Sequence, residues 1–330
     1  MTWRALRRLL PGWSELRCAI TDTVSELAVR PPYSPQVAGA LATVAPATLG
    51  RHIAALADAG PRWREDRENI AATLRHLRDE LSGFGYEVVE ERYGQAPHQV
   101  NLFASLTGQD PAAPLVEVGA HWDTVQGSPG ADDNASGVAG VLEIARALHG
   151  LGPRQRGIRF CFFGEEEEWM TGSGAHVERF AAAGEAVEGL IALEMIGFRD
   201  SRTGSQRAPL RIPGVFSPPR TGDFIAVIAD LRSLPFANAV QRSARRYVPG
   251  LKLYLLKRTG GLLRDAARSD HLPYWRTARR GLLVTDTANL RNPHYHKATD
   301  TLPTLDLDFA ADVTRAVAGA LIDLADRRRG

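Results

Sequence analysis

Hydrophobic side chains recur at helical spacing in three stretches of the chain. Within residues 70–84, five apolar residues alternate at intervals of four and three, and Gly83 and Gly85 mark the end of the run. Residues 138–148 and 309–324 repeat this period. Each pattern predicts an amphipathic helix with one face against a core.

Short apolar runs lie between these helices and predict strands. Residues 100–106 alternate with period two, which is typical of a half-buried strand, whereas 157–163 is almost continuously apolar. The predicted strands are 86–93, 100–106, 115–120, 157–163, 187–196, 224–229 and 282–285. Because strands alternate with amphipathic helices, we predict an α/β fold with a central mixed, mostly parallel β-sheet covered by helices on both faces.

The first fifty residues follow a different pattern. Trp3, Leu6, Leu10 and Trp13 form one apolar stripe, and a proline-containing stretch follows. We interpret residues 1–50 as a helical extension of unknown role and 51–330 as the main domain. Contact with a membrane or partner is the less favoured reading, because Pro11 limits the helix to a few turns.

Composition narrows the class of protein. With 330 residues, 44% hydrophobic and 24% charged, the chain is able to bury a large core. The net charge of +2 gives no electrostatic argument for nucleic acid. Cys18 and Cys161 form no metal or disulfide pattern. No run reaches the ~20 apolar residues of a transmembrane helix.

The N-terminus also bears on location. Its early arginines resemble those of a signal peptide, but Pro11, Glu15 and Arg17 interrupt the apolar stretch. We therefore expect a cytoplasmic protein, with secretion as the open alternative.

Polar residues cluster where predicted strands end, and ligands of α/β folds gather at such places. His121 directly follows the run 115–120, and Asp123 is close enough along the chain to orient its imidazole. Asp132 and Asp133 stand in a glycine-rich turn before the helix at 138–148. Helix capping explains one acid in that turn, not two.

Further acids and a histidine lie at later strand ends. Residues 165–168 are four consecutive glutamates after the strand 157–163, and we expect Glu165 and Glu168 to be solvated. Glu194 ends an apolar strand, and His296 lies in the loop after 282–285. Mutual repulsion among these carboxylates would be relieved by a cation. Mixed imidazole and carboxylate ligands suit zinc, and five ligands with one shared carboxylate suit two ions.

An ordered set of motifs resembles the M28 zinc aminopeptidases over about residues 51–330. The motifs are A-H-W-D at 120–123, G-A-D-D-N-A-S-G at 130–137, E-E with G-S within 166–173, E-M-I-G at 194–197, S-D-H at 269–271 and Y-H at 295–296. The resemblance implies a zinc-exopeptidase-like fold and hydrolysis of peptide bonds at an N-terminus. It also implies two zinc ions per chain, held by His121, Asp133, Glu167, Glu194 and His296, with Asp133 shared between them.

The same resemblance assigns the catalytic side chains. Glu166 would be the general base and Tyr295 would hydrogen-bond the tetrahedral intermediate. Asp123 and Asp270 would support the ligands without binding an ion. The resemblance further implies a cis peptide bond after Asp133.

The sequence departs from the family pattern at one proposed metal ligand, and two functions other than peptide hydrolysis are also considered. The family usually has Asp where this chain has Glu194, and the longer side chain is expected to alter one metal site. A single-zinc glutaminyl cyclase-like acyl transferase shares the fold, and a non-catalytic binding module is the other alternative.

Six arginines lie in the stretches 198–222 and 256–268 and would favour acidic substrates if they faced the active site. The preferred interpretation is that these stretches are solvated loops. The arginines are Arg202, Arg207, Arg211, Arg258, Arg264 and Arg268. Peptides or aminoacyl compounds are the expected partners, and the oligomeric state is open.

Overall fold

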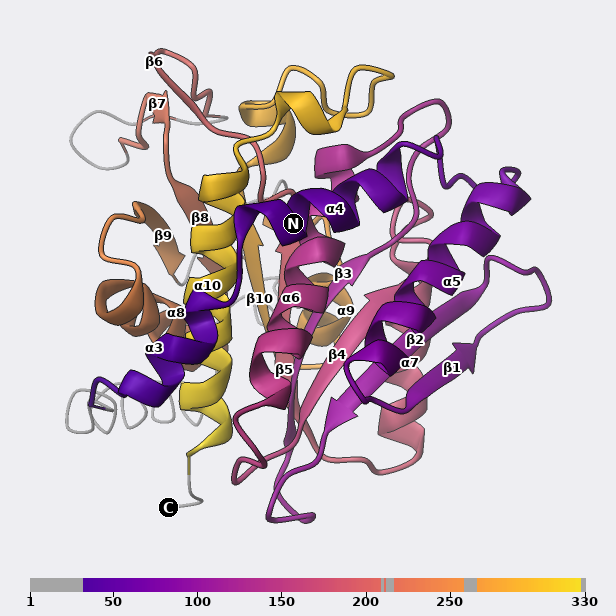
Figure 1. Cartoon of the computed structure of the whole chain (residues 1–330), viewed down its shortest axis with the longest axis vertical. Coiled ribbons are helices and arrows are strands. Elements are labelled where there is room, and N and C mark those ends of the chain that lie inside the picture. The colour runs from indigo at the N-terminus through magenta and orange to yellow at the C-terminus, as the bar shows by residue number, and fades with distance from the viewer. Residues whose placement is uncertain (1–31, 209–210, 212–216, 258–265, 328–330) are drawn as a thin grey trace, which may run out of the picture.

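An eight-stranded sheet of order β1-β2-β4-β3-β5-β10-β8-β9 forms the centre of the molecule (Figure 1). The computed structural model describes residues 32–208, 211, 217–257 and 266–327. The strands of this sheet are β1 (Val88–Arg92), β2 (Val100–Leu106), β3 (Leu115–His121), β4 (Ile158–Phe163), β5 (Val187–Glu194), β8 (Ile225–Ala229), β9 (Leu253–Lys257) and β10 (Arg280–Thr285). A separate ribbon pairs β6 (Asp200–Thr203) with β7 (Thr221–Gly222).

Pairing within the sheet is mixed, as the sequence predicts. The parallel neighbours are β4 with β3, β3 with β5, β5 with β10, and β8 with β9. The remaining pairs, at β1–β2, β2–β4 and β10–β8, are antiparallel. The three adjacent strands β4, β3 and β5 therefore end at the same edge of the sheet, which brings their C-terminal residues together.

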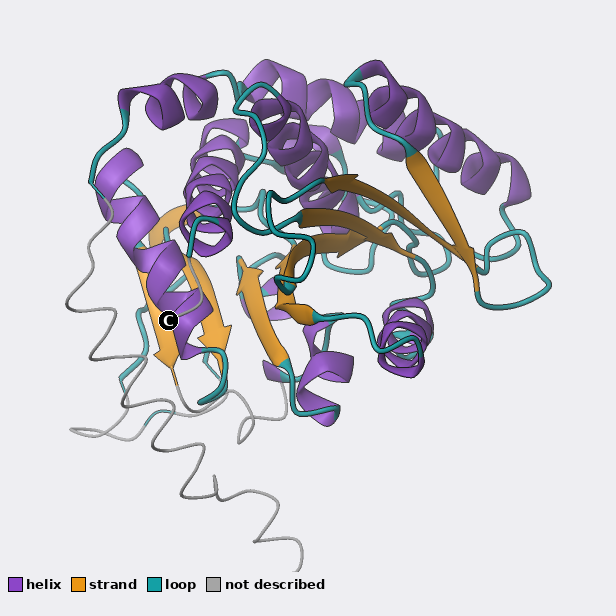
Figure 2. Ribbon diagram, turned by 90° about the horizontal axis from the view of Figure 1, so that it is seen from below, coloured by secondary structure: helices purple, strands orange, loops and turns teal. Residues whose placement is uncertain are grey.

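Helices cover both faces of the sheet (Figure 2). They are α3 (Pro35–Ala42), α4 (Pro46–Ala57), α5 (Arg67–Gly83), α6 (Gly137–His149), α7 (Thr171–Ala182), α8 (Leu234–Tyr247), α9 (His271–Arg276) and α10 (Leu307–Ala325). The larger core lies between the sheet and the apolar faces of α3–α6, α8 and α10. The smaller core, on the opposite face, includes Val177 and Phe180 of α7 and Tyr274 of α9.

Strand alternation decides which core each side chain enters. On β8, Ile225 and Val227 point into the larger core, whereas Ala226 and Ile228 belong to the smaller one. Within the described residues, the helices and strands predicted from residue 70 onward are present, with ends shifted by up to three residues. Strand β9 and helices α7 and α8 were not among the predicted elements.

The N-terminal segment does not separate from the main domain at residue 50. Helix α4 spans that position, and Leu49 and Ile53, on either side of it, belong to one core. The predicted stripe from Trp3 to Trp13 lies outside the described residues. Among the described helices none is by itself long and apolar enough to cross a membrane; only the pair α3 and α4, bent by 44°, passes on length and composition.

Candidate functional site

Three parallel strands deliver polar side chains to one edge of the sheet. His121 is the last residue of β3 and Glu194 is the last of β5, while Glu166 and Glu167 follow the end of β4. Asp133 comes from the turn before α6. His296 comes from the loop after β10 and has a positive φ of 58°.

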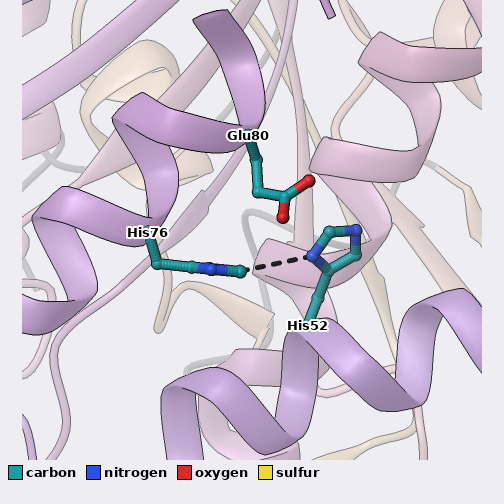
Figure 3. A group of neighbouring side chains, drawn as sticks. All are labelled: His52, His76 and Glu80. Carbon is teal, nitrogen blue, oxygen red and sulfur yellow. Dashed lines mark hydrogen bonds between the residues drawn. The ribbon is translucent and has the colours of Figure 1, made fainter. Parts of the chain in front are cut away.

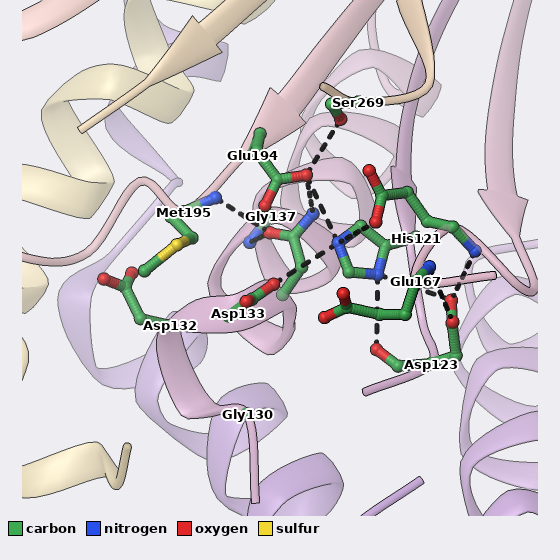
Figure 4. A network of polar contacts seen from close by, with 12 residues as sticks. His121, Asp123, Gly130, Asp132, Asp133, Gly137, Glu167, Glu194, Met195 and Ser269 are labelled. Carbon is green, nitrogen blue, oxygen red and sulfur yellow. Dashed lines mark hydrogen bonds and ion pairs between the residues drawn. The ribbon is translucent and has the colours of Figure 1, made fainter. Parts of the chain in front are cut away.

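His121 lies against two of the predicted carboxylates. Its Nε2 is 3.4 Å from Asp133 Oδ1 and 3.2 Å from Glu194 Oε2. Figure 4 shows both carboxylates directed at the His121 ring. These three side chains form one group whose ligand atoms are all mutually close. The extra methylene of Glu194 thus does not take its carboxylate away from the site.

His296 forms a second group with the other carboxylate oxygen of Asp133 and with Glu167. Its Nε2 is 3.1 Å from Asp133 Oδ2 and 3.2 Å from Glu167 Oε1. Asp133 therefore presents one oxygen to each histidine and joins the two groups. The structure brings together all five side chains that the sequence proposed as metal ligands.

The donor atoms fit divalent cations. Two nitrogen or oxygen ligands of a tetrahedral zinc ion lie about 3.3 Å apart, which matches the four contacts above. Among the described residues, Nε2 of His121, Nε2 of His296 and Oε1 of Glu167 are buried without a hydrogen-bond partner. Buried polar atoms are normally satisfied, so such an atom in the His121 group and two in the His296 group indicate that each group binds a ligand.

Buried negative charge gives a second argument for cations. Burial, and after it repulsion from neighbouring carboxylates, raises the pKa of Glu166 well above its usual range. Burial and then Asp133 raise the pKa of Glu167 to about 7. The pKa of Glu194 is also raised, with burial as the largest cause. Divalent ions would let these acids remain ionised at neutral pH.

Asp123 contacts the backbone of Glu166 and Glu167 and the ring of His121. Its carboxylate accepts hydrogen bonds from the backbone N–H groups of Glu166 and Glu167, at 3.1 and 3.2 Å. His121 Nδ1 lies 3.2 Å from the Asp123 carbonyl oxygen. One residue thus orients a histidine on β3 and fixes the two glutamates after β4.

Asp270, the other predicted support, is placed differently. It is 1% exposed, and within the described part of the chain its carboxylate oxygens have no hydrogen-bond partner. Burial raises its pKa to about 7. Asp270 therefore adds to the buried acid around the site without a hydrogen bond to any of the proposed ligands.

Asp132 and Asp133 differ in what they contact. Asp132 accepts hydrogen bonds from Gly197 N and Asn292 Nδ2, away from both histidines. Asp300 holds the turn by accepting from the backbone N–H groups of Asp132 and Asp133 at 2.9 and 3.0 Å. The Asp133–Asn134 peptide bond is cis, as the family resemblance implied.

Ser269 was not assigned a role from the sequence. Its hydroxyl donates to Glu194 Oε2 at 2.8 Å and so steers the carboxylate that departs from the usual Asp. Ser269 belongs to the S-D-H motif at 269–271, but the family resemblance assigned a role only to Asp270 of that motif.

The expectation that Glu165 is solvated is wrong. Glu165 is 8% exposed and pairs with His98 at 3.1 Å. Its positive φ of 55° turns the chain directly after β4 and sends its side chain away from Glu166. Glu168 is partly exposed and pairs with Arg64 on the surface.

Tyr295 stacks on His296, with ring centroids 3.7 Å apart. Its hydroxyl oxygen accepts a hydrogen bond from Arg268 at 3.2 Å. Both residues line the pocket that contains Asp133, Glu166, Glu167 and Glu194. The Tyr295 proton is thus free to point into this pocket.

The remainder of the pocket has an apolar wall. Strands β8, β9 and β10 supply it from the sheet face that carries the smaller core. The apolar lining residues on and beside these strands are Phe224, Ala226, Ile228, Tyr254, Leu256, Ala266 and Leu283, and those from other loops are Ala208, Pro218, Ala288 and Leu290. Besides the carboxylates and these apolar side chains, polar and charged residues such as Gln206, Arg207 and Arg268 line the cavity.

Two of the six arginines lie outside the pocket and two line it. Arg202 is exposed and pairs with Asp200. Arg211 donates to the carbonyls of Pro218 and Pro219. Arg207 and Arg268 line the pocket, and each already donates to a neighbour, Asn289 O and Tyr295 Oη. Arg258 and Arg264 lie outside the described residues.

Comparison with known proteins identifies the family. The model of peptidase family M28 matches residues 101–321. The chain belongs to this family of peptidases. It is 33% identical over 274 residues to the uncharacterized protein YfbL of Escherichia coli (strain K12), covering 78% of this chain and 81% of that protein. It is 27% identical over 262 residues to leucine aminopeptidase 1 of Trichophyton equinum, covering 74% of this chain but 62% of that protein.

Solved structures share the fold. The LapA aminopeptidase of Legionella pneumophila superposes with a TM-score of 0.73 at 19% identity, covering 91% of this chain and 78% of that one. The glutaminyl cyclase of Porphyromonas gingivalis gives a TM-score of 0.62 at 22% identity, covering 85% of this chain and 98% of that one. At such identities the likeness concerns the fold alone.

Proposed function

We propose that this protein is a zinc-dependent aminopeptidase that removes apolar residues from the N-terminus of peptides. The observation that carries the proposal is Asp133, whose two oxygens join the His121–Glu194 and His296–Glu167 groups at the end of an apolar pocket. The relatives named as leucine aminopeptidases support this activity.

Zinc would be held by His121, Asp133 and Glu194 in one group and by Asp133, Glu167 and His296 in the other. Two such ions lower the pKa of water towards 7 and polarise a carbonyl group, and that is the chemistry they would supply here. The remaining tasks, which are moving the proton, stabilising the oxyanion and binding the side chain, fall to residues of the chain.

Glu166 is the proposed general base. Its Oε2 lies 3.9 Å from His121 Nε2, beside the ligands but outside the two groups of close contacts. Its carboxylate would accept a proton from the attacking water and return it to the leaving amine.

Tyr295 is the proposed donor to the developing oxyanion. Because Arg268 donates to the Tyr295 oxygen, the hydroxyl proton remains available for the substrate. The same arginine fixes the ring that stacks on His296.

The apolar wall sets the proposed specificity. A leucine side chain would bury its surface against residues such as Ile228 and Leu256, whereas a glutamate side chain would lose its hydration there. The acidic end of the pocket suits the positively charged N-terminal amine.

A substrate panel tests this specificity. We expect leucyl anilide to be hydrolysed at least roughly tenfold faster, in kcat/KM, than alanyl anilide, and glutamyl anilide to be the slowest. Leu256→Arg should lower the leucyl-to-alanyl ratio, with alanyl anilide as the internal control for folding. A preference for glutamyl anilide would contradict the proposal.

Glutaminyl cyclisation is the second function to test, because a cyclase shares the fold. The two groups joined by Asp133 favour the hydrolase, since they offer ligands for two ions. Each of His121→Ala and His296→Ala should remove one zinc equivalent, and His294→Ala in the same loop should remove none. Pyroglutamate release from a glutaminyl peptide without anilide hydrolysis would favour the cyclase. Absence of both reactions would favour a binding module.

A further inference from the structure

A second cluster of metal-binding side chains lies between two helices, apart from the residues of the proposed active site. It consists of His52 on α4 and His76 and Glu80 on α5. One ligand atom from each lies within 4.8 Å of the others. Figure 3 shows the Glu80 carboxylate pointing toward the two imidazole rings.

The spacing on α5 places two of these residues on one face. His76 and Glu80 are four residues apart, so their side chains lie one turn from each other on the helix surface. Their face is directed at α4, where His52 is 3% exposed. Two helices thus contribute to one point, which a metal ion would crosslink.

The imidazole nitrogens have the separation of two ligands on one ion. His52 Nδ1 and His76 Nε2 are 3.2 Å apart, close to the edge of about 3.3 Å expected for tetrahedral zinc. Without an ion, the same distance is a hydrogen bond between the rings. Glu80 favours the metal site, because its partly buried carboxylate lies near both imidazole rings, where it would be the third ligand of an ion.

The other nitrogen of His52 is already oriented. His52 Nε2 lies 3.5 Å from Glu143 Oε1, on α6. The Glu143 carboxylate also accepts hydrogen bonds from Thr48 Oγ1 at 2.6 Å and from Arg146, which keeps it ionised. An ionised carboxylate at Nε2 favours the proton there and leaves the lone pair on Nδ1, which faces His76. Metal-binding histidines usually have such a carboxylate on their second nitrogen.

We propose that His52, His76 and Glu80 form a structural zinc site that clamps α4 to α5. Two imidazoles and one carboxylate are ligands suited to zinc, with water as the fourth ligand. The site stands apart from the proposed catalytic ligands and shares no residue with them. The loop between the two clamped helices carries Arg62, which binds backbone carbonyls on either side of the active site.

Zinc content of full-length variants tests the clamp. His76→Asn and Glu80→Gln should each bind one zinc equivalent fewer than the wild type after equilibration in a zinc buffer. Affinity at this site should fall by more than the ~10–100-fold that loss of an outer partner costs. Asp79→Asn, an equal change of charge at the exposed neighbouring position on α5, should retain the full zinc content.

Each variant is compared with the wild type, so the expected loss of one zinc equivalent does not depend on how many ions the active site holds. Hydrolysis of leucyl anilide by Glu80→Gln at saturating zinc reports the active site separately. An anomalous peak at the zinc edge between the three side chains of zinc-soaked crystals would support the proposal. Equal zinc content in the wild type, His76→Asn and Glu80→Gln would overturn it, leaving the pair as a histidine–histidine hydrogen bond.

Discussion

Adjacent acids in this chain have different environments, and the backbone decides which one faces the site. Asp133 contacts both histidines, whereas its neighbour Asp132 accepts hydrogen bonds from Gly197 and Asn292. Glu167 lies in the His296 group, while Glu165 is turned toward His98. Assigning a role to one acid in such a run therefore requires its φ and ψ angles as well as its residue type.

Replacing Glu166 separates base from ligand. We expect Glu166→Gln to retain its zinc and to lower kcat by roughly 10²–10⁴-fold, because the amide cannot accept the proton of the attacking water. Zinc content and leucyl anilide kinetics measure the two effects. Glu168→Gln, at a partly exposed position paired with Arg64, is the control and should leave both unchanged. Loss of zinc from Glu166→Gln would instead make Glu166 a ligand.

Ser269 acts on the site through Glu194. Ser269→Ala removes the hydroxyl that donates to Glu194 Oε2, so we expect weaker zinc binding in the His121 group and unchanged binding in the His296 group. The expected loss of affinity is roughly 10–100-fold, as for other partners of metal ligands. Zinc titration monitored by activity measures it. An unaltered titration would show that Glu194 is held without the serine.

At the scale of elements, one buried arginine ties the segments of the active site together. Arg62 is 1% exposed and donates to the carbonyl oxygens of Leu56, Trp122, Pro129 and Gly130 at 2.6–3.0 Å. It thereby joins the end of α4 to the residue after β3 and to the turn before Asp133. Burial lowers the pKa of Arg62 to about 10, which still leaves it charged at neutral pH.

Removal of this arginine should affect stability and metal binding together. Arg62→Met leaves several buried carbonyls without a donor, each costing about 1–3 kcal/mol, so we expect the free energy of unfolding to fall by roughly 3 kcal/mol or more. Urea denaturation and zinc content measure the two effects. Arg64→Met, at the exposed position two residues on, should change neither. A normal zinc content in a destabilised Arg62→Met would restrict the role of Arg62 to folding.

Helices and strands were predicted most reliably where the apolar pattern repeated over a long stretch of sequence. The helices α5, α6 and α10 follow from apolar residues repeated over several turns. Strand β9 was missed because Leu253–Lys257 is short and its side chains are only half buried. Helix α8 was missed although Phe236, Val240 and Ala244 recur at intervals of four on one buried face. That signal was present in the sequence, and the surrounding arginines obscured it.

At the scale of the whole molecule, a buried ion-pair network crosses the sheet. His176 on α7 lies 3.3 Å from Glu91 on β1 and 3.0 Å from Glu117 on β3. Arg159 and Tyr274 complete the contacts of Glu117. Burial alone would lower the pKa of His176, but Glu117 and then Glu91 outweigh it and raise the pKa to about 9.

This network predicts a pH dependence of stability. Because the pKa of His176 is higher in the folded chain than its unfolded value of 6.5, protonation stabilises the fold fully below pH 6.5 and is lost as the pH rises through about 9. The free energy of unfolding should fall by on the order of 3 kcal/mol across that range. His176→Asn should remove this dependence in urea denaturation curves, whereas His149→Asn, at an exposed position, should retain it. Equal slopes in wild type and His176→Asn would contradict the assignment.

The sequence by itself determined the residue types at the strand ends, because side-chain chemistry and spacing are local properties. It therefore predicted the α/β sheet, and together with the family resemblance it predicted that His121, Asp133, Glu167, Glu194 and His296 would meet. Only the tertiary structure decided which face of β8–β10 would line the pocket, that Ser269 would hold Glu194, and that His52 would meet His76 and Glu80. These contacts join residues far apart in the chain or on different elements, and packing of the helices on the sheet sets their distances.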